Sequence, residues 1–562
     1  MTADNKTSNT GAEFIADSVQ GLGIDHVFFV DAVLRETLVA LEKRGIKRIL
    51  AHSEKSAAYM ADGFARATGK LGVCMAQSVG AANLAAGLQD AYLNRTPVLA
   101  ITGKKDAMHQ YRNSYQEVPH APLYESVTKY QADVDEIDQL PYLLKQAVRS
   151  AFTGTKRPVH LDFMHYRGSD IEDATLQLPA GVYAQFVTPD AADQAPASEA
   201  SLAAAMSRLV AAERPMMVVG MGADEAGIAD ALRQFAEKFD VPIATSVGGR
   251  SLIETSHPLH FGVVGTYSAP YANEMLFDAD LVIYVGCHTG DQISCDWKIP
   301  ATATPIIHID IDPAELGRNY PNTCGLAGHP VKVLEQLVAA GEAQSRAAWT
   351  AKCAKAQSDW VASYQDIITS PQQPIRAERL AYDLSDALPD DAIVVADTGF
   401  SATWTAQLTE FRKPTQQYIR AAGSLGWAFP AAVGVKCGQM NRPVICFTGD
   451  GAMHYHSSEL ETVRRWNIPL ITIVNNNSSL GQGLRSVKQL YKDRDGNLDD
   501  LVNFHPINFA ELAEVYGIKG MRVERAEDIV PTIKKAIELG EPVVIDVVTD
   551  ADCNPQPAWI PA

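Results

Sequence analysis

Residues 444–481 have the sequence VICFTGDGAMHYHSSELETVRRWNIPLITIVNNNSSLG. Two short apolar runs, 444–448 and 470–474, flank a segment from about His456 to Trp466 in which apolar residues recur at helical spacing. Short, uninterrupted apolar runs are typical of strands that are buried on both faces of a parallel sheet. The stretch therefore predicts a strand, a helix and a second parallel strand joined by a right-handed crossover.

Polar residues follow both predicted strands, Asp450 after the first and Asn477 after the second. The carboxyl ends of neighbouring parallel strands meet at one edge of a sheet, where open α/β sheets bind ligands. Their carboxylate and amide oxygens suit Mg²⁺, and the glycines beside Asp450 let a diphosphate approach the backbone. For Gly449–Gly451 alone, a turn between core strands is an equally good interpretation, but the asparagines at the next strand end favour a ligand site.

This stretch resembles the diphosphate–metal motif of thiamine-diphosphate enzymes, in which Gly-Asp-Gly and a later Asn-Asn bracket one strand–helix–strand unit. The resemblance implies that the side chains of Asp450 and Asn477 and the backbone carbonyl of Ser479 bind Mg²⁺. Asn475 is one asparagine more than the motif has, and alignment on Leu480-Gly481 favours Asn477 as the ligand. The implied cofactor-binding residues here are Gly449, Asp450, Gly451, Ala452, Asn477, Ser479, Leu480 and Gly481.

The composition is that of an ordinary soluble globular protein, with 562 residues, 46% hydrophobic and 20% charged. This length predicts three or four domains, at roughly 150 residues each. The formal net charge of −19 argues against a nucleic-acid or anionic-membrane partner. Eight cysteines without a C-x-x-C pair, no signal-peptide core in residues 1–13 and no membrane-length apolar run predict a cytoplasmic protein.

Alternating helices and apolar strands from about Glu13 to Met164 predict a parallel sheet that is covered on both faces. The same alternation recurs twice, and linker-like segments lie at 192–197 and 370–374. We therefore expect an α/β fold of three doubly wound parallel-sheet domains. By the resemblance these are a pyrimidine-binding domain (11–185), a central nucleotide-binding-like domain (198–343) and a diphosphate- and Mg-binding domain (372–552).

Glu54 lies where a predicted strand gives way to an apolar helix, Lys55–Thr68. Taken alone, it is well explained as an acid that complements the dipole of a helix N-terminus. However, residues 52–69, HSEKSAAYMADGFARATG, resemble the glutamate segment of thiamine-diphosphate enzymes. The implied role of Glu54 is to hydrogen-bond N1′ of the pyrimidine ring, so that the imino tautomer of the cofactor removes the thiazolium C2 proton. Ser53 separates His52 from Glu54, unlike the family, and leaves the role of His52 open.

Further segments of the first domain resemble the acetolactate synthase branch of the family: 78–83 (SVGAAN), 101–103 (ITG), 115–118 (YQEV) and 128–130 (TKY). They add Asn83 as a cofactor-binding residue and Gln116 as a catalytic candidate. The loop after Phe28 is shorter than in that branch. That loop also lacks the Pro-Gly-Gly of the acetolactate synthase branch. Asp31 stands near the place of these missing glycines, where decarboxylases of the family carry an acid. Lys104 replaces the glutamine that usually follows Ile-Thr-Gly. Asp31 and Lys104 are therefore catalytic candidates on the substrate side.

The central segment contains a predicted strand, 216–220, followed by Gly220-Met221-Gly222-Ala223. The full Gly-x-Gly-x-x-Gly fingerprint of dinucleotide sites is absent. Residues 257–265, 278–281 and 307–313 resemble the central domain of acetolactate synthases, which holds FAD, and His288 stands near the place of an FAD-contacting arginine. Three alternatives stay open: bound FAD, another nucleotide such as ADP, or an empty scaffold domain.

The last segment starts with a predicted helix, 377–388, and strand, 392–396. The resemblance implies that Leu425 lies between the two thiamine rings and that the Gly423 carbonyl accepts a hydrogen bond from the 4′-amino group. Core packing is the alternative for Leu425. His454 and His456 either face the substrate or merely begin a helix, and the proline-rich tail at 554–561 is either a lid or a packed arm. The other implied cofactor-binding residues are Gly399, Phe400, Ser401 and Ser424.

These features predict a thiamine-diphosphate and Mg²⁺-dependent enzyme that forms or cleaves a C–C bond next to a carbonyl. An acetolactate synthase-like carboligase or a 2-oxo acid decarboxylase is the leading hypothesis. The alternative is a lyase or hydrolase acting on a hydroxy ketone, diketone or 2-hydroxyacyl-CoA, and a non-catalytic scaffold is a further one. A dinucleotide dehydrogenase is disfavoured by the missing fingerprint.

Glu54 belongs to the first domain, whereas Asp450 and Asn477 belong to the last. Thiamine enzymes of this type place one domain from each of two chains around each cofactor. The resemblance therefore implies a homodimer or homotetramer with active sites between chains, acting on a small-molecule carbonyl substrate.

Overall fold

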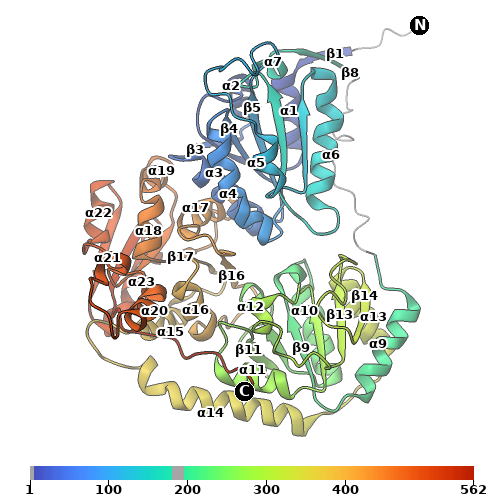
Figure 1. Ribbon diagram of the computed structural model, residues 1–562, viewed down its shortest axis with the longest axis vertical. Helices are drawn as coiled ribbons and strands as arrows, with labels where there is room; N and C mark the ends of the chain where they lie inside the picture. The colour runs from blue at the N-terminus through green and yellow to red at the C-terminus, as the bar shows by residue number, and fades with distance from the viewer. Residues whose placement is uncertain (1–5, 180–194) are drawn as a thin grey trace.

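The computed structural model describes residues 6–179 and 195–562, in which three six-stranded sheets have only parallel strand pairs (Figure 1). The predicted fold class, three α/β domains with doubly wound parallel sheets, is confirmed. All three sheets lie within the predicted domain ranges. The ranges themselves stay predictions, and the boundary at 185 and residues 192–194 of the predicted linker at 192–197 lie outside the described residues.

The N-terminal sheet has the strand order β3 (Lys47–Leu50), β2 (His26–Phe29), β4 (Gly72–Gln77), β5 (Val98–Lys104), β7 (Val159–Met164), β6 (Tyr130–Val134). Its helices are α1 (Gly11–Gly21), α2 (Arg35–Lys43), α3 (Glu54–Thr68), α4 (Gly80–Leu93), α5 (Ala121–Glu125), α6 (Leu140–Phe152) and α7 (Ser169–Glu172). A separate antiparallel pair joins β1 (Lys6–Thr10) to β8 (Thr175–Pro179).

The central sheet has the order β11 (His260–Val263), β10 (Ile243–Thr245), β9 (Pro215–Val219), β12 (Leu281–Val285), β13 (Ile306–Asp310), β14 (Thr323–Ala327). Its helices are α9 (Glu199–Ala211), α10 (Ile228–Phe239), α11 (Pro270–Asp278), α12 (Asp291–Ser294) and α13 (Pro330–Ala340). The long helix α14 (Ala347–Ile368) then runs along the base of the molecule to the last domain (Figure 1).

The C-terminal sheet has the order β16 (Gln417–Arg420), β15 (Ile393–Ala396), β17 (Val444–Gly449), β18 (Ile471–Asn476), β20 (Val543–Val548), β19 (Lys519–Val523). The strand order changes direction between β15 and β17, so the carboxyl ends of these two strands form the switch point at which such sheets bind ligands. The helices are α15 (Ala377–Ala387), α16 (Phe400–Leu408), α17 (Ala428–Gly438), α18 (Asp450–His456), α19 (Glu459–Arg465), α20 (Gly481–Leu490), α21 (Asp499–Val502), α22 (Phe509–Val515) and α23 (Ile529–Leu539).

The helix predicted from about His456 to Trp466 is wrong in its extent. The structure has two helices there: α18 begins at Asp450, directly after β17, and α19 ends at Arg465. The apolar spacing that guided the prediction belongs to α19 alone. The residues of α18 carry no such pattern, because that helix begins at the ligand edge of the sheet.

The first and last domains of the chain pack directly on each other through α3 and α17. A Cβ on Gly63 would collide with the carbonyl oxygen of Ala431, so only glycine permits this helix separation. The indole N–H of Trp427 donates to the Asp62 carboxylate at 2.8 Å. Ser53, which interrupts the family motif, caps α3 by accepting from the Ser56 N–H.

The C-terminal tail is a packed arm rather than a lid. The ring of Trp559 lies 5.5 Å from that of Phe277, and Asn273 donates to the Trp559 carbonyl. Trp360 of α14 donates to the Gln556 side chain at 2.8 Å. Among residues 6–179 and 195–562, no helix has both the length and the apolar character that crossing a membrane requires.

Candidate functional site

The carboxyl ends of β17 and β18 bring Asp450, Asn477 and Ser479 together. One backbone N–H, that of Ser479, lies 3.1 Å from Asp450 Oδ2 and 3.1 Å from Asn477 Oδ1. Burial raises the pKa of Asp450 to about 6, although hydrogen bonds from the Gly451 and Ser479 N–H groups oppose that rise. A cation beside a buried carboxylate would offset the cost of its charge, and these oxygen donors fit Mg²⁺.

The three consecutive asparagines have different surroundings. Asn475 Oδ1 accepts from the Thr549 hydroxyl at 2.6 Å. Asn476 donates to the Asp546 carboxylate and to the Ile507 carbonyl, each at 2.8 Å. Both residues end β18 and are buried, whereas Asn477 follows the strand and is only half-buried. The structure thus favours Asn477 as the residue that reaches a ligand.

The other predicted diphosphate-binding loops converge on the same edge. A Cβ on Gly481 would lie 3.2 Å from Asn477 and 3.6 Å from the Phe400 ring, and one on Gly449 would lie 3.7 Å from Ser401 Oγ. Gly399 has φ of 66°, which favours glycine, and Gln482 approaches its backbone. The structure therefore assembles the predicted residues Gly399, Phe400, Ser401, Gly449, Asp450, Gly451, Ala452, Asn477, Ser479, Leu480 and Gly481 around one edge of the sheet.

The segment Gly423–Gly426 borders this edge. Gly426, at φ 87°, packs on the Ala452 carbonyl and on Tyr455 of α18. Leu425 is half-buried rather than part of the core, and Gly423 is exposed with no heavy atom within 4 Å of where its Cβ would lie. Open space beside Gly423 and a half-exposed Leu425 favour a ligand-facing segment over core packing.

Glu54 is the first residue of α3 and lies in the N-terminal domain. Its Oε2 accepts from the Asn83 side chain at 2.8 Å, and a Cβ on Gly80 would lie 2.6 Å from its Oε1. The contacts that the structure gives this carboxylate belong to the first domain, at the start of α4. The structure thus brings Glu54 and Asn83 together.

Gln116 lies in the loop after β5, where its carbonyl accepts from the Ser78 hydroxyl. Lys104, at the end of β5, pairs with Asp133 at 2.7 Å and Asp135 at 2.8 Å. Asp31 is exposed and pairs with Arg35 at 2.9 Å. Lys104 and Asp31 are thus each held in ion pairs with neighbouring side chains. The catalytic roles of Gln116, Lys104 and Asp31 stay predictions.

A buried polar cluster that the sequence analysis did not identify supports the turn at Ser78. His120 donates from one ring nitrogen to the Ser78 carbonyl at 2.9 Å and contacts the Asp162 carboxylate through the other at 2.9 Å. Burial raises the pKa of Asp162, but hydrogen bonds from His120 and Thr102 outweigh it and leave the pKa below its usual value. Burial lowers the pKa of His160, which contacts Thr102, to about 3. The available signal was two polar residues in an otherwise apolar strand, His160 and Asp162.

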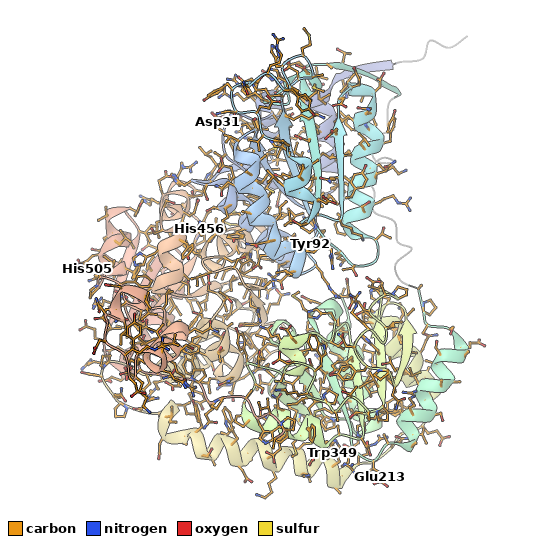
Figure 2. The ribbon with its side chains drawn as sticks, viewed as in Figure 1. Asp31, Tyr92, Glu213, Trp349, His456 and His505 are labelled. Atoms are coloured by element: carbon orange, nitrogen blue, oxygen red, sulfur yellow. The ribbon has the colours of Figure 1, made fainter. Side chains whose placement is uncertain are left out.

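His454 and His456 differ in their surroundings. His456 is buried between the domains, where its ring contacts the Ser56 hydroxyl at 2.9 Å and the edge of Tyr59 (Figure 2). Burial lowers its pKa to about 4. His454 is exposed and lies against Phe504 and Phe509. Of the two, His454 is the one that can face a ligand.

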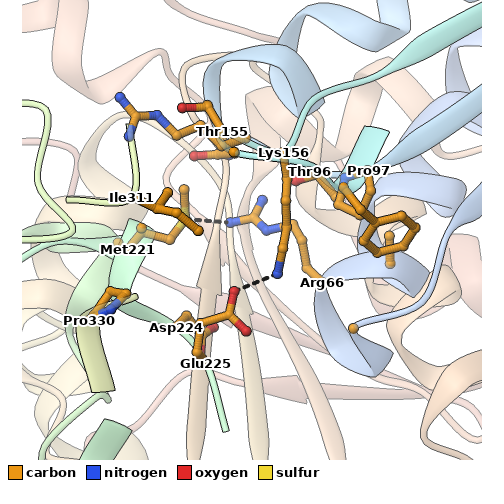
Figure 3. Close-up of a pocket in the computed structure, with 18 of the residues that line it drawn as sticks. Arg66, Thr96, Pro97, Thr155, Lys156, Met221, Asp224, Glu225, Ile311 and Pro330 are labelled. Atoms are coloured by element: carbon orange, nitrogen blue, oxygen red, sulfur yellow. Dashed lines mark hydrogen bonds and ion pairs between the residues drawn. The ribbon is translucent and has the colours of Figure 1, made fainter. Parts of the chain in front are cut away.

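A cavity of about 290 Å³ lies at the carboxyl ends of the central strands and against the first domain (Figure 3). Cationic and apolar residues both line the cavity, and Asp224, Glu225 and Asp310 add carboxylates. Lys156 pairs with Glu225 at 2.5 Å, and Asp310 has a buried carboxylate oxygen without a hydrogen-bond partner. His288 is not among the described residues that line this cavity. The cationic and apolar lining residues include Arg66, Arg95, Lys156, Met221, Ile311 and Pro330.

Comparison with protein families agrees with the three sheets. Residues 9–123 match the N-terminal TPP binding domain of thiamine pyrophosphate enzymes, 202–337 their central domain, and 397–547 their C-terminal TPP binding domain. An acetolactate synthase of Arthrospira platensis is 30% identical and covers 98% of this chain and 96% of its own length.

The chain belongs to the thiamine pyrophosphate enzyme family.

Two further relatives agree with this assignment. The acetolactate synthase isozyme 2 large subunit of Escherichia coli is 30% identical, covering 96% of this chain and 95% of the relative. A probable acetolactate synthase large subunit of Methanocaldococcus jannaschii is 29% identical, and the match covers 96% of this chain and 92% of the relative. This member of the thiamine pyrophosphate enzyme family is therefore an acetolactate synthase-like enzyme that depends on thiamine diphosphate, as the motifs predict.

Proposed function

We propose that the chain is a carboligase of the acetolactate synthase type, which releases CO₂ from a 2-oxo acid and joins the remaining acyl unit to a second carbonyl. The observation that carries the proposal is the Ser479 N–H shared by Asp450 and Asn477 at the carboxyl ends of β17 and β18, next to the switch point of the C-terminal sheet. The bound cofactor supplies a nucleophilic carbon and an electron sink for chemistry beside a carbonyl. The relatives do not favour the alternative lyase or hydrolase.

The residues of the chain have distinct roles under this proposal. Asp450, Asn477 and the Ser479 carbonyl hold Mg²⁺, and the glycine-rich loops after β15 and β17 hold the diphosphate. Glu54 holds a proton at N1′ of the pyrimidine, with Asn83 orienting its carboxylate. Leu425 supports the bent shape of the cofactor.

A substrate panel tests the carboligase proposal. The purified protein, supplied with thiamine diphosphate and Mg²⁺, is incubated with 2-oxo acids singly and in pairs and with hydroxy ketones. We expect CO₂ release together with a coupled hydroxy-oxo acid, and loss of both when EDTA removes the metal. CO₂ with only an aldehyde would indicate a decarboxylase, and cleavage of a hydroxy ketone without CO₂ would indicate the alternative lyase. No turnover with any substrate would favour a scaffold.

We also propose a homodimer, or a dimer of dimers, with each site between two chains. The loop beside Gln116 exposes large apolar side chains, with Met108 at 79%, Tyr111 at 96% and Tyr115 at 77% exposure. Such a patch next to the Glu54 half-site is typical of a surface that a partner covers. Several relatives are named large subunits. Sedimentation that finds a fully active monomer would contradict this proposal.

For the central cavity we propose a nucleotide, with Asp310 facing the ribose and Arg66, Arg95 or Lys156 facing phosphate. Small-molecule sites span roughly 300–1,000 Å³, so a cavity of about 290 Å³ favours ADP over the larger FAD. A visible absorbance scan distinguishes the two, because only FAD is yellow, and acid release followed by chromatography identifies ADP. The eight buried, unpaired cysteines support a reducing, cytoplasmic location.

A further inference from the structure

Asp90, in the N-terminal domain, contacts the segment that carries Leu425 in the C-terminal domain. It is buried in the third turn of α4, where its Oδ1 accepts from the Ala422 N–H at 2.9 Å. Its Oδ2 lies 3.2 Å from the Gly423 nitrogen and 3.1 Å from the Ser424 nitrogen. One carboxylate thus accepts from three consecutive backbone N–H groups. Tyr92, two residues further along α4, marks this end of the helix in Figure 2.

These bonds fix the direction of the intervening carbonyls. In a trans peptide the N–H and the preceding C=O point in opposite directions, so the Ser424 N–H that faces Asp90 turns the Gly423 carbonyl away from α4. The Ala422 carbonyl is already taken by Arg420, whose Nη2 lies 2.8 Å away. Gly423 is exposed, with open space beside its Cα. Its carbonyl is thus directed away from α4 and from the Asp90 carboxylate.

A second buried carboxylate holds the segment from the other end. Asp397, directly after β15, accepts from the Gly426 N–H at 3.1 Å and the Ala428 N–H at 2.9 Å. Leu425 therefore lies between residues 422–424, whose N–H groups bind Asp90, and the N–H groups of Gly426 and Ala428, which bind Asp397. Asp397 belongs to the same domain as Leu425, but Asp90 does not, so the N-terminal domain of the chain also sets this geometry.

The same helix reaches Glu54. Asn83, in the first turn of α4, donates to the Glu54 carboxylate, and Asp90 follows it by seven residues, about 10 Å along a helix. Asn94, just after α4, donates to Asp90 Oδ1 at 2.9 Å and fixes the orientation of its carboxylate. One rigid element therefore contacts both the proposed proton-holding residue and the proposed cofactor-shaping segment.

We propose that Asp90 is a positioning residue for the thiamine cofactor: it aims the Gly423 carbonyl at the 4′-amino group and holds Leu425 between the rings. This rests on the proposed function. Asp90 touches neither cofactor nor substrate and acts through the backbone of residues 422–424. The cofactor conformation in the C-terminal domain is then set by the N-terminal domain of the same chain.

The test compares Asp90→Asn with Glu172→Gln. Glu172 is a matched control, because it is also a buried carboxylate of the N-terminal domain that accepts a backbone N–H, from Thr37 at 2.9 Å. Both variants replace an acceptor oxygen by an NH₂ group, so both should lose thermal stability. At saturating thiamine diphosphate and Mg²⁺, we expect kcat to fall on the order of 10- to 100-fold in Asp90→Asn only, with KM nearly unchanged. The near-ultraviolet circular dichroism of the bound aminopyrimidine should change in that variant alone.

Wild-type kcat and dichroism in folded Asp90→Asn would overturn the proposal, as would equal losses of kcat in both variants. If Asp90→Asn does not fold, Asn94→Ala serves instead, because it leaves the carboxylate but removes the amide that orients it. That variant should lose kcat by a few-fold, and unchanged kcat would overturn the proposal. Failure of the proposed function is distinguishable: the wild-type protein would then show no turnover that depends on thiamine diphosphate.

Discussion

The two half-sites of this chain differ in how complete they are. In the C-terminal domain, Asp450 and Asn477 share one N–H, and Asp397 fixes the Leu425 segment together with Asp90 of the N-terminal domain. In the N-terminal domain, Glu54 meets an exposed Asn83 beside a loop whose tyrosines face outward. Under the proposed function, one chain preorganises the metal and diphosphate end, and a second surface encloses the proton-transfer end.

The largest expected effect is at Glu54. Glu54→Gln keeps the size of the side chain but removes the carboxylate, so turnover should fall by about 10²- to 10⁴-fold while thiamine diphosphate still binds. Steady-state rates and cofactor titration measure the two effects separately. Glu461→Gln is the control, because Glu461 binds His52 near the same helix end yet lies on the surface, and its rate should be unchanged. Near wild-type turnover in Glu54→Gln would refute the mechanism.

The next effect distinguishes the asparagines of the C-terminal half-site. Asn477→Ala should weaken Mg²⁺-dependent binding of thiamine diphosphate by roughly 10- to 100-fold, because it removes a proposed metal ligand. Asn475→Ala should instead lose about 1 kcal/mol of stability with metal affinity intact, because its oxygen accepts from Thr549. Calorimetric titration and thermal unfolding measure both. The reverse pattern would make Asn475 the ligand.

A third prediction concerns the acid sensitivity of the N-terminal core. Burial lowers the pKa of His160 to about 3, below the ~6.5 of an unfolded chain. The unfolded state then binds more protons, so stability is lost as the pH falls from about 6.5 toward 3. From pH 7 to pH 5 the loss is about 2 kcal/mol. The stability difference between wild type and His160→Gln should shrink by this amount, as denaturant unfolding at the two pH values can measure. An equal difference at both values would contradict the prediction.

The smallest effect tests the surface that completes the N-terminal half-site. Tyr111→Ser should raise the dimer dissociation constant on the order of tenfold, because it removes an exposed ring from the proposed interface. Val515→Ser is the control, since Val515 is also a large apolar residue that is 82% exposed but lies on α22 of the C-terminal domain. Sedimentation at several concentrations compares the variants. Unchanged association in Tyr111→Ser would place the partner elsewhere.

Much of the fold followed from local pattern. The buried parallel strands have continuous apolar sequences, and the strands predicted around 444–448 and 470–474 match β17 and β18 closely. The start of α18 could not be predicted in this way, because Ala452 and Met453 are the buried apolar side chains of this short helix and two adjacent residues form no helical repeat. The cluster of His120 with Asp162 was missed because 42 residues separate these two side chains, and the polar residues of β7 do not by themselves identify His120 as a partner.

By itself, the sequence determined the three parallel sheets and the positions of Asp450, Asn477 and Glu54, because strand patterns and motif spacing are local properties of the chain. Only the tertiary structure decided that the side chains of Asn475 and Asn476 form hydrogen bonds with residues of the same domain, and that Asp90 and Asp397 bind the backbone on either side of Leu425. The physical reason is that every residue other than proline carries the same backbone N–H group. Which carboxylate that group meets depends on how distant segments pack, since 334 residues separate Asp90 from Ser424.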